Sequence, residues 1–138
     1  MAEIALNTSY AEENDIANGK SRQVIEDAWA ANTSAALKYH AATVTGSIKR
    51  ARIKVSVTSD ATKTYTFVIT NVSTGKTVTA AGQLYDASPV ATAGTVYDLT
   101  LSTTAADVAV SEGDILTLSM AGGTGSGLAS MELVIESD

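Results

Sequence analysis

Residues 47–58 read SIKRARIKVSVT, a run in which small or apolar side chains alternate with basic or polar ones. Successive residues of a β-strand point to opposite sides, so a period of two residues is typical of a half-buried strand. One face of this strand would carry Ala51, Ile53, Val55 and Val57, and the other Arg50, Arg52, Lys54, Ser56 and Thr58. The stretch therefore predicts a strand with an apolar inner face and a basic outer face.

Four further stretches show the same period of two: KTYTFVIT (63–70), TVYDLTLS (95–102), GDILTLSM (113–120) and SMELVIES (130–137). Short turn sequences separate them, and no segment between them is long enough for the helical crossover that parallel strands need. Strands of this kind pack as two layers around one core. The pattern predicts an all-β fold, an antiparallel two-sheet β-sandwich of jelly-roll type, over residues 31–138.

The first 30 residues have a different character. The stretch NTSYAEENDIANGK, residues 7–20, is polar, and residues 1–17 fit an arm that buries too little apolar surface to fold alone. The following SRQVIEDAWAAN fits a short helix, with Ser21 as N-cap and an apolar stripe of Val24, Ile25, Ala28 and Trp29. We therefore expect residues 1–30 to form an N-terminal arm with a short helix that covers one end or face of the sandwich.

Composition narrows the classes of function. The chain has 138 residues, no Cys and a net charge of −6, so disulfides and thiolate metal sites are excluded. The acidic balance argues against a nucleic-acid partner. No apolar run approaches the roughly 20 residues of a membrane span, and the start lacks the basic and apolar regions of a signal peptide. We expect a protein without a membrane or nucleic-acid partner that is not exported by the usual route.

The glycine-rich stretch GGTGSG, residues 122–127, has the glycine spacing of a phosphate-binding loop. Such a loop requires a Lys after its last glycine and a helix beyond it. Leu128 follows instead, and then a stretch that alternates like a strand. We interpret the glycines as a hairpin connection between two strands.

No residue pattern predicts catalysis. His40 is the only histidine, no nucleophile elbow surrounds a serine, and we interpret His40 as a rim or packing residue of a strand. The pair Glu112 and Asp114 flanks Gly113, which fits a turn in which Asp114 accepts hydrogen bonds from free amides. We predict no enzyme activity, no small-molecule substrate, no cofactor and no metal site.

Two groups of residues are candidates for contact with a protein partner. The bases Lys49, Arg50, Arg52 and Lys54 form a solvated outer face, protect an edge strand from pairing, or contact an acidic surface of a partner or of a neighbouring copy. Trp29 is either core or an anchor at a subunit interface. The candidate partner-binding residues are Tyr10, Glu12, Glu13, Trp29, Arg50, Arg52 and Lys54.

An acidic arm, a β domain rich in Thr, Ala and Val, and the ending VAVSEGDILTLSMAGGTGSGLASMELVIESD (108–138) together resemble the decoration, or cement, proteins of tailed-bacteriophage capsids. The part EGDILTLSM…GTGSGLASMELVIE also looks like the final hairpin of β-sandwich modules in phage head fibres and tails. The resemblance brings no functional residue motif with it.

The resemblance implies a structural virion protein, made in the host bacterial cytoplasm and bound to the capsid exterior. It would be a homotrimer whose partner is the major capsid protein, and it would stabilise the shell by clamping adjacent subunits. The alternative is a carbohydrate- or receptor-binding β-sandwich module of a phage fibre.

Overall fold

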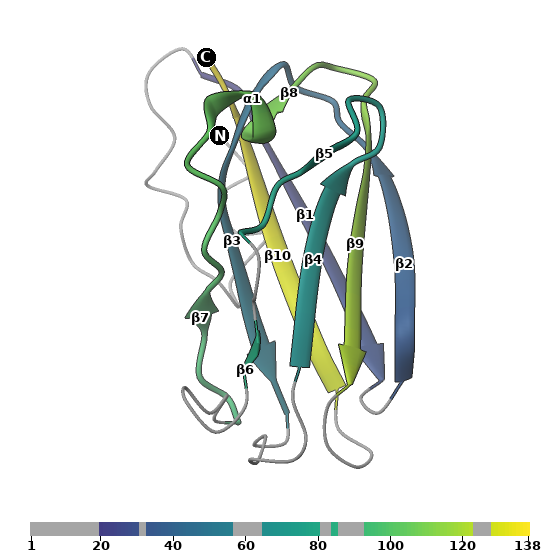
Figure 1. Ribbon diagram of the computed structural model, residues 1–138. Coiled ribbons are helices and arrows are strands. Elements are labelled where there is room, and N and C mark those ends of the chain that lie inside the picture. The colour runs from purple at the N-terminus through teal and green to yellow at the C-terminus, as the bar shows by residue number, and fades with distance from the viewer. Residues whose placement is uncertain (1–19, 31–32, 57–64, 81–83, 86–92, 123–127) are drawn as a thin grey trace.

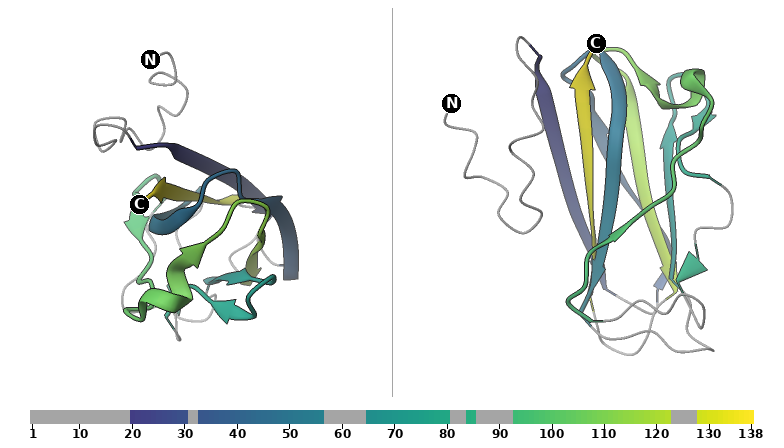
Figure 2. Two further views of the ribbon diagram at one scale, coloured as in Figure 1. Left: turned by 90° about the horizontal axis from the view of Figure 1, so that it is seen from above. Right: turned by 90° about the vertical axis from the view of Figure 1, so that its left-hand side faces the viewer.

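The computed structural model describes residues 20–30, 33–56, 65–80, 84–85, 93–122 and 128–138. These residues form two antiparallel sheets that pack face to face (Figure 1), which confirms the predicted all-β, two-sheet sandwich. The view from above in Figure 2 separates the two layers. We name them sheet A and sheet B.

Sheet A has the strand order β1-β10-β3-β7, and β8 also pairs with β3. Its strands are β1 (Arg22–Ala30), β10 (Leu128–Ser137), β3 (Gly46–Val55), β7 (Tyr97–Asp98) and β8 (Ala109–Val110). β10 lies between β1 and β3 and pairs antiparallel with both. A register shift between Val134 and Ile135 marks a bulge in the β10–β3 pairing, which places Lys49 outside the regular alternation.

Sheet B has the order β2-β9-β4-β5, and β6 also pairs with β4. Its strands are β2 (Thr33–Ala41), β9 (Ile115–Gly122), β4 (Tyr65–Asn71), β5 (Lys76–Thr77) and β6 (Leu84–Tyr85). The one helix in the described part of the chain is the single turn α1 (Ala105–Val108), which lies near one end of the sandwich (Figure 1).

The core lies between the sheets and consists of the inward residues that the period of two predicts. Fully buried at 0% exposure are Met131, Leu133 and Ile135 of β10, Leu116, Leu118 and Met120 of β9, and Tyr65, Phe67 and Ile69 of β4. Ala51, Ile53 and Val55 of β3 are also buried, whereas Val57 lies outside the described residues. Each large apolar side chain buried in this way stabilises the fold by about 1.5–3 kcal/mol.

The predicted helix over residues 21–29 is wrong, because residues 22–30 form strand β1. β1 pairs with β10 along its whole length, from Arg22 opposite Glu136 to Ala30 opposite Leu128. Ile25 and Trp29 are four residues apart, a spacing that fits one face of a helix and equally one face of a strand. The intervening Asp27 also faces inward, which only the strand allows. Among the residues that the structure describes, the sandwich therefore begins at Arg22.

Several short connections that would be expected to form hairpins lead instead from one sheet to the other. β1 lies in sheet A and the next strand, β2, in sheet B; β9 lies in sheet B and the next strand, β10, in sheet A. The interpretation of residues 122–127 as a hairpin connection is therefore wrong, although a strand does follow them. Residues 123–127 themselves lie outside the described part of the chain.

Gly46 tests the close pairing of β3 with β10. A Cβ atom at this position would lie 2.0 Å from the backbone carbonyl oxygen of Glu136. Backbone cannot yield as a flexible side chain can, so we expect Gly46→Ala to lower the free energy of unfolding by about 1–3 kcal/mol. Urea denaturation measures the change, and Ser47→Ala on the same strand is the control. Equal stability of the Gly46→Ala variant and the wild type would contradict the described register.

Candidate interaction surfaces

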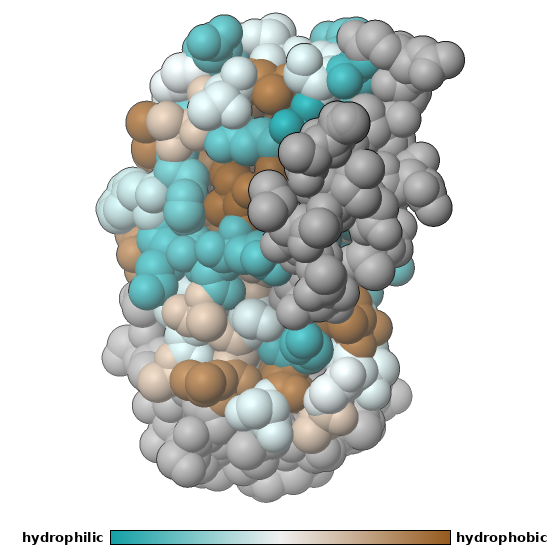
Figure 3. Space-filling view, turned by 180° about the vertical axis from the view of Figure 1, so that it is seen from behind, coloured by the Kyte–Doolittle hydropathy of each residue, from teal (hydrophilic) through white to brown (hydrophobic). Residues whose placement is uncertain are grey.

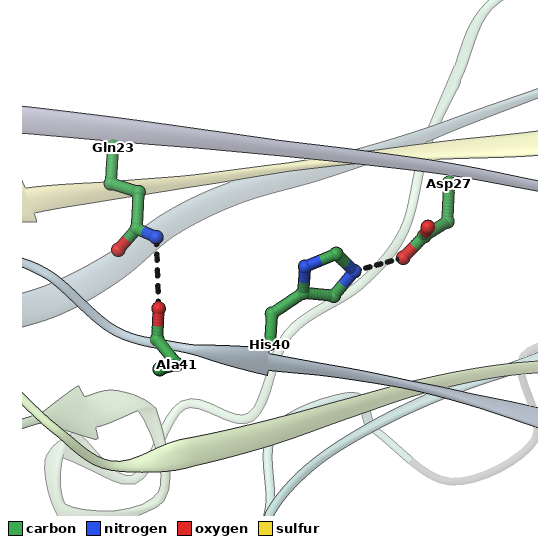
Figure 4. Close-up of polar contacts among 4 residues, drawn as sticks. All are labelled: Gln23, Asp27, His40 and Ala41. Carbon is green, nitrogen blue, oxygen red and sulfur yellow. Dashed lines mark hydrogen bonds and ion pairs between the residues drawn. The ribbon is translucent and has the colours of Figure 1, made fainter.

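The edge strands β1 and β2 face each other along one side of the sandwich, and polar side chains join them (Figure 4). His40 Nε2 of β2 and an Asp27 carboxylate oxygen of β1 form a close hydrogen bond. Gln23 of β1 donates to the Ala41 carbonyl oxygen at 3.0 Å and accepts from the Thr43 backbone amide at 2.7 Å. The sequence-based placement of His40 in a strand, as a rim and packing residue, is confirmed.

We call the contacts of Gln23, Asp27 and His40 between β1 and β2 the polar seam. The polar seam also protects the two sheet edges. Asp27, Lys38 and His40 are charged or polar residues on inward positions of edge strands, where the alternation would otherwise place apolar side chains. Inward charges at an edge disfavour the addition of a further strand, because a new strand would desolvate them. A second protein chain would therefore bind more easily to a sheet face than to the edges of β1 and β2.

The outer face of sheet A is rich in charge, and we call it the charged face. Figure 3 views this side, on which hydrophilic residues gather across the middle. Its described charged residues are Arg22 and Glu26 of β1, Glu132 and Glu136 of β10, Lys49, Arg50, Arg52 and Lys54 of β3, and Asp98 of β7.

The bases of β3 lie beside acids of the neighbouring strands. In one row across the sheet, Glu132 pairs in register with Arg52, and Arg52 with Asp98. The Nε atom of Arg52 donates to Asp98 Oδ1 at 3.2 Å, and Lys49 Nζ lies 3.7 Å from Glu136 Oε1. The acids on both sides of Arg52 offset part of the repulsion among the three successive bases, while Arg50 stands opposite Val134 and Lys54 opposite Ser130. The charged face is thus a mosaic of both signs.

The structure separates the sequence-predicted candidates into three groups. Arg50, Arg52 and Lys54 share one outer face as predicted, but β3 has paired neighbours on both sides, so the interpretation that they protect an edge strand is wrong. Trp29 is a core residue, which was one of its two interpretations. Its side chain is 4% exposed, so little of the indole is accessible to a partner. Tyr10, Glu12 and Glu13 lie outside the described residues.

The outer face of sheet B differs sharply, and we call it the uncharged face. Its described outward side chains are Leu37, Tyr39 and Ala41 of β2, Ile115, Thr117, Ser119 and Ala121 of β9, and Thr66, Val68, Thr70 and Val72 on and just after β4. None of these side chains is charged. Leu37 is 52% exposed, Tyr39 63% and Val72 51%.

Sequence reasoning missed the uncharged face. In residues 37–40, LKYH, a period of two suggests that the apolar Leu37 and Tyr39 point inward and the polar residues outward. The structure has the opposite orientation, because Asp27 and Gln23 of β1 provide polar partners inside the seam. A signal was present in the sequence, since Asp27 and Gln23 stand at the inward spacing of Ile25 and Trp29. This spacing indicates inward polar residues only if β1 is already known to be a strand.

A hydrogen-bonded corner fixes one end of the uncharged face. Asp114 Oδ2 accepts from Asn71 Nδ2 and from the Ser111 backbone amide, both at 2.9 Å. These contacts hold the pKa of Asp114 below its ordinary value of 3.8, with the Asn71 hydrogen bond as the larger cause. The turn with Gly113 at φ 93° and Asp114 as acceptor is the one that the sequence predicts. The corner positions Val72, whose amide donates to the Ile115 carbonyl at 2.9 Å.

A hollow of about 580 Å³ lies between β4 and the segment 99–107. Hydroxyl side chains line much of it, including Thr66, Thr79 and Thr100. Its one carboxylate, Asp107, accepts a hydrogen bond from Ser102 Oγ at 2.7 Å. Asp107 is thus engaged in holding α1 to the segment that precedes it.

Two features are absent from the part of the chain that the structure describes. No cluster of three or more His, Cys, Asp or Glu there is placed to hold a metal ion. In the same residues no helix has the length and hydropathy to cross a membrane.

The seam predicts a measurable coupling between β1 and β2. We expect Asp27→Ala and His40→Ala each to destabilise the fold, and the double variant to lose less than the sum of the two. The coupling should be about 0.5–3 kcal/mol, the range for contacting polar pairs. Chemical denaturation of the four proteins measures it, and strictly additive losses would show that the two side chains do not interact.

The corner predicts a pH dependence of stability. Because the pKa of Asp114 is lowered in the folded state, its contribution is complete above pH 3.8 and is lost as the pH falls below that value. We expect Asp114→Asn to be less stable than the wild type at neutral pH and to lose less stability on acidification. Urea denaturation between about pH 6 and pH 3 measures both. Glu112→Gln, an exposed carboxylate in the same turn, should keep the wild-type loss; a wild-type loss in Asp114→Asn would contradict the role of the corner.

Comparisons with known proteins provide no relative for this chain. No protein-family model matches it, and neither a curated protein nor a solved structure does. What the chain does has to be inferred from its own surfaces.

Proposed function

We propose that this chain is a structural protein of a tailed-phage virion, which binds the outside of the capsid and stabilises the shell by clamping adjacent major capsid subunits. The resemblance of residues 108–138 to capsid decoration proteins suggests the partner. The observation that carries the proposal is the pair of opposite outer faces with different chemistry, one a charge mosaic and one uncharged. A clamp has to contact at least two neighbouring shell subunits. The charged face extends across β1, β10, β3 and β7, and we assign both contacts to it.

The charged face suits contact with the shell. The accessible charges of this face, Glu26, Lys49 and Asp98, match only a complementary pattern of charges, so they select one docking register and reject others. Each exposed charge pair adds little affinity, about 0–1 kcal/mol, and is weakened by salt. Many copies bound to the assembled lattice nevertheless stabilise it, because a ligand that prefers the assembled state shifts the equilibrium towards that state.

The alternative, a carbohydrate-binding module, has one observation in its favour. Tyr39 is 63% exposed on a flat sheet face, as an aromatic platform for a sugar ring would be. Its register neighbours are Thr117 on β9 and then Thr70 on β4, and the large side chains nearby are aliphatic. A sugar site also needs several convergent polar groups to orient the ring, and the described part of this face has only hydroxyls. We therefore favour a protein partner.

Co-sedimentation with empty shells, assembled from the major capsid protein of the phage that encodes this chain, tests the proposal. We expect the wild type to pellet with the shells and to raise the temperature at which they rupture. Lys54→Glu, on the charged face, should weaken binding about tenfold or more, because it reverses one charge of the mosaic. Lys76→Glu on β5 is the charge-matched control and should bind as the wild type does.

Two results would contradict the proposal. One is a folded wild type that does not pellet with the shells at any salt concentration. The other is saturable binding to a glycan on an array by the same preparation, which would favour the fibre module instead.

A further inference from the structure

We propose that the uncharged face is where a second copy of this chain docks, with sheet B of one copy against sheet B of the other. The inference rests on the proposed function only in taking the chain as an adhesion protein. It assigns the contact between copies to one surface, and leaves the charged face for the shell.

Most of the exposed large apolar side chains among the described residues lie on the uncharged face. Seven large hydrophobic residues in the described part of the chain are exposed, and four of them, Leu37, Tyr39, Val72 and Ile115, lie on this face. Exposed apolar side chains scattered singly are ordinary, but a gathering on one flat face is typical of a surface that meets another protein.

The centre of the face is already shielded from water. Ser119 lies between Leu37 and Val68 across the sheet, and it is 8% exposed. Thr117 lies between Tyr39 and Thr70 and is 7% exposed. Docking therefore has little polar surface left to desolvate, and desolvation of polar groups is a main cost of association.

Charge selects a second copy as the occupant. Two copies with a net charge of −6 each repel one another, and contact is least unfavourable where neither presents a charge. The described part of the uncharged face meets this condition, whereas the charged face does not. The seam between β1 and β2 is also unsuitable, because Asp27, Lys38 and His40 protect those edges. A face-to-face pair of sheet B remains.

The size of the face predicts a weak contact. Three strands about 4.8 Å apart and about eight residues long at about 3.4 Å per residue cover roughly 400 Å². The pair would bury about 800 Å² in total, whereas stable complexes bury about 1,200–2,000 Å². Free copies should therefore associate only at high concentration. Copies joined by a flexible tether would associate readily, because tethering raises their effective concentration to about the millimolar range.

Sedimentation velocity between about 10 µM and about 1 mM tests the inference, since the contact should have a Kd in the micromolar to millimolar range. We expect the sedimentation coefficient of the wild type to rise with concentration. Leu37→Glu should raise the Kd at least about tenfold, because a charge is then buried opposite its own copy. Leu128→Glu is the matched control: it is the same substitution, at 56% exposure against 52%, on the outer face of the other sheet. It should associate as the wild type does.

A wild type that stays monomeric throughout this range would overturn the inference, and so would equal effects of the two substitutions. Circular dichroism melts establish that both variants are folded. A shell-binding measurement distinguishes a failure of this inference from a failure of the proposed function. If a monomeric wild type loses shell binding on Leu37→Glu, the uncharged face belongs to the shell, and only the inference falls. If copies associate through this face but no shell is bound, the inference holds and the proposed function falls.

Discussion

The pairing of β10 with β1 on one side and β3 on the other is the constraint on which the rest of this structure depends. The inward residues of β10, Met131, Leu133 and Ile135, are fully buried and form much of one side of the core. Its outward residues set the rows of the charged face, since Glu132 stands between Glu26 of β1 and Arg52 of β3. One strand thereby determines both the packing of the sandwich and the chemistry of one of its two outer surfaces.

Much of the fold is predictable from the sequence because half-buried strands impose a period of two. The inward residues of β3, β4, β9 and β10 were all identifiable in this way. β1 was not, because Ile25 and Trp29 satisfy helical and strand periods alike, and the choice between them depends on a partner strand about 100 positions away. Sheet membership was not predictable either: the step from β9 to β10 reads locally as a hairpin, although the strands lie in different layers.

The two surfaces differ in how far the sequence reveals them. Arg50, Arg52 and Lys54 alternate with apolar residues, so their common face is evident, but the acids beside them come from β10 and β7, which only the folded sheet brings near. Leu37 and Tyr39 look like core residues, because local pattern contains no information on the polar seam that turns β2 over. The uncharged face is thus a tertiary property, produced where Asp27 and His40 meet.

The place of β10 in sheet A has a consequence for biosynthesis. β1 and β3 are made early, yet neither can pair with β10, the strand that lies between them, until β10 has left the ribosome. At about 5–20 residues per second, the roughly 100 residues between β1 and β10 take about 5–20 s to translate. During that interval Ile25, Trp29 and Ile53 belong to strands with open edges. Exposed apolar residues and open strand edges are what chaperones bind, so we expect chaperones to bind the nascent chain during this interval. Sheet A is completed only when β10, its last strand, leaves the ribosome.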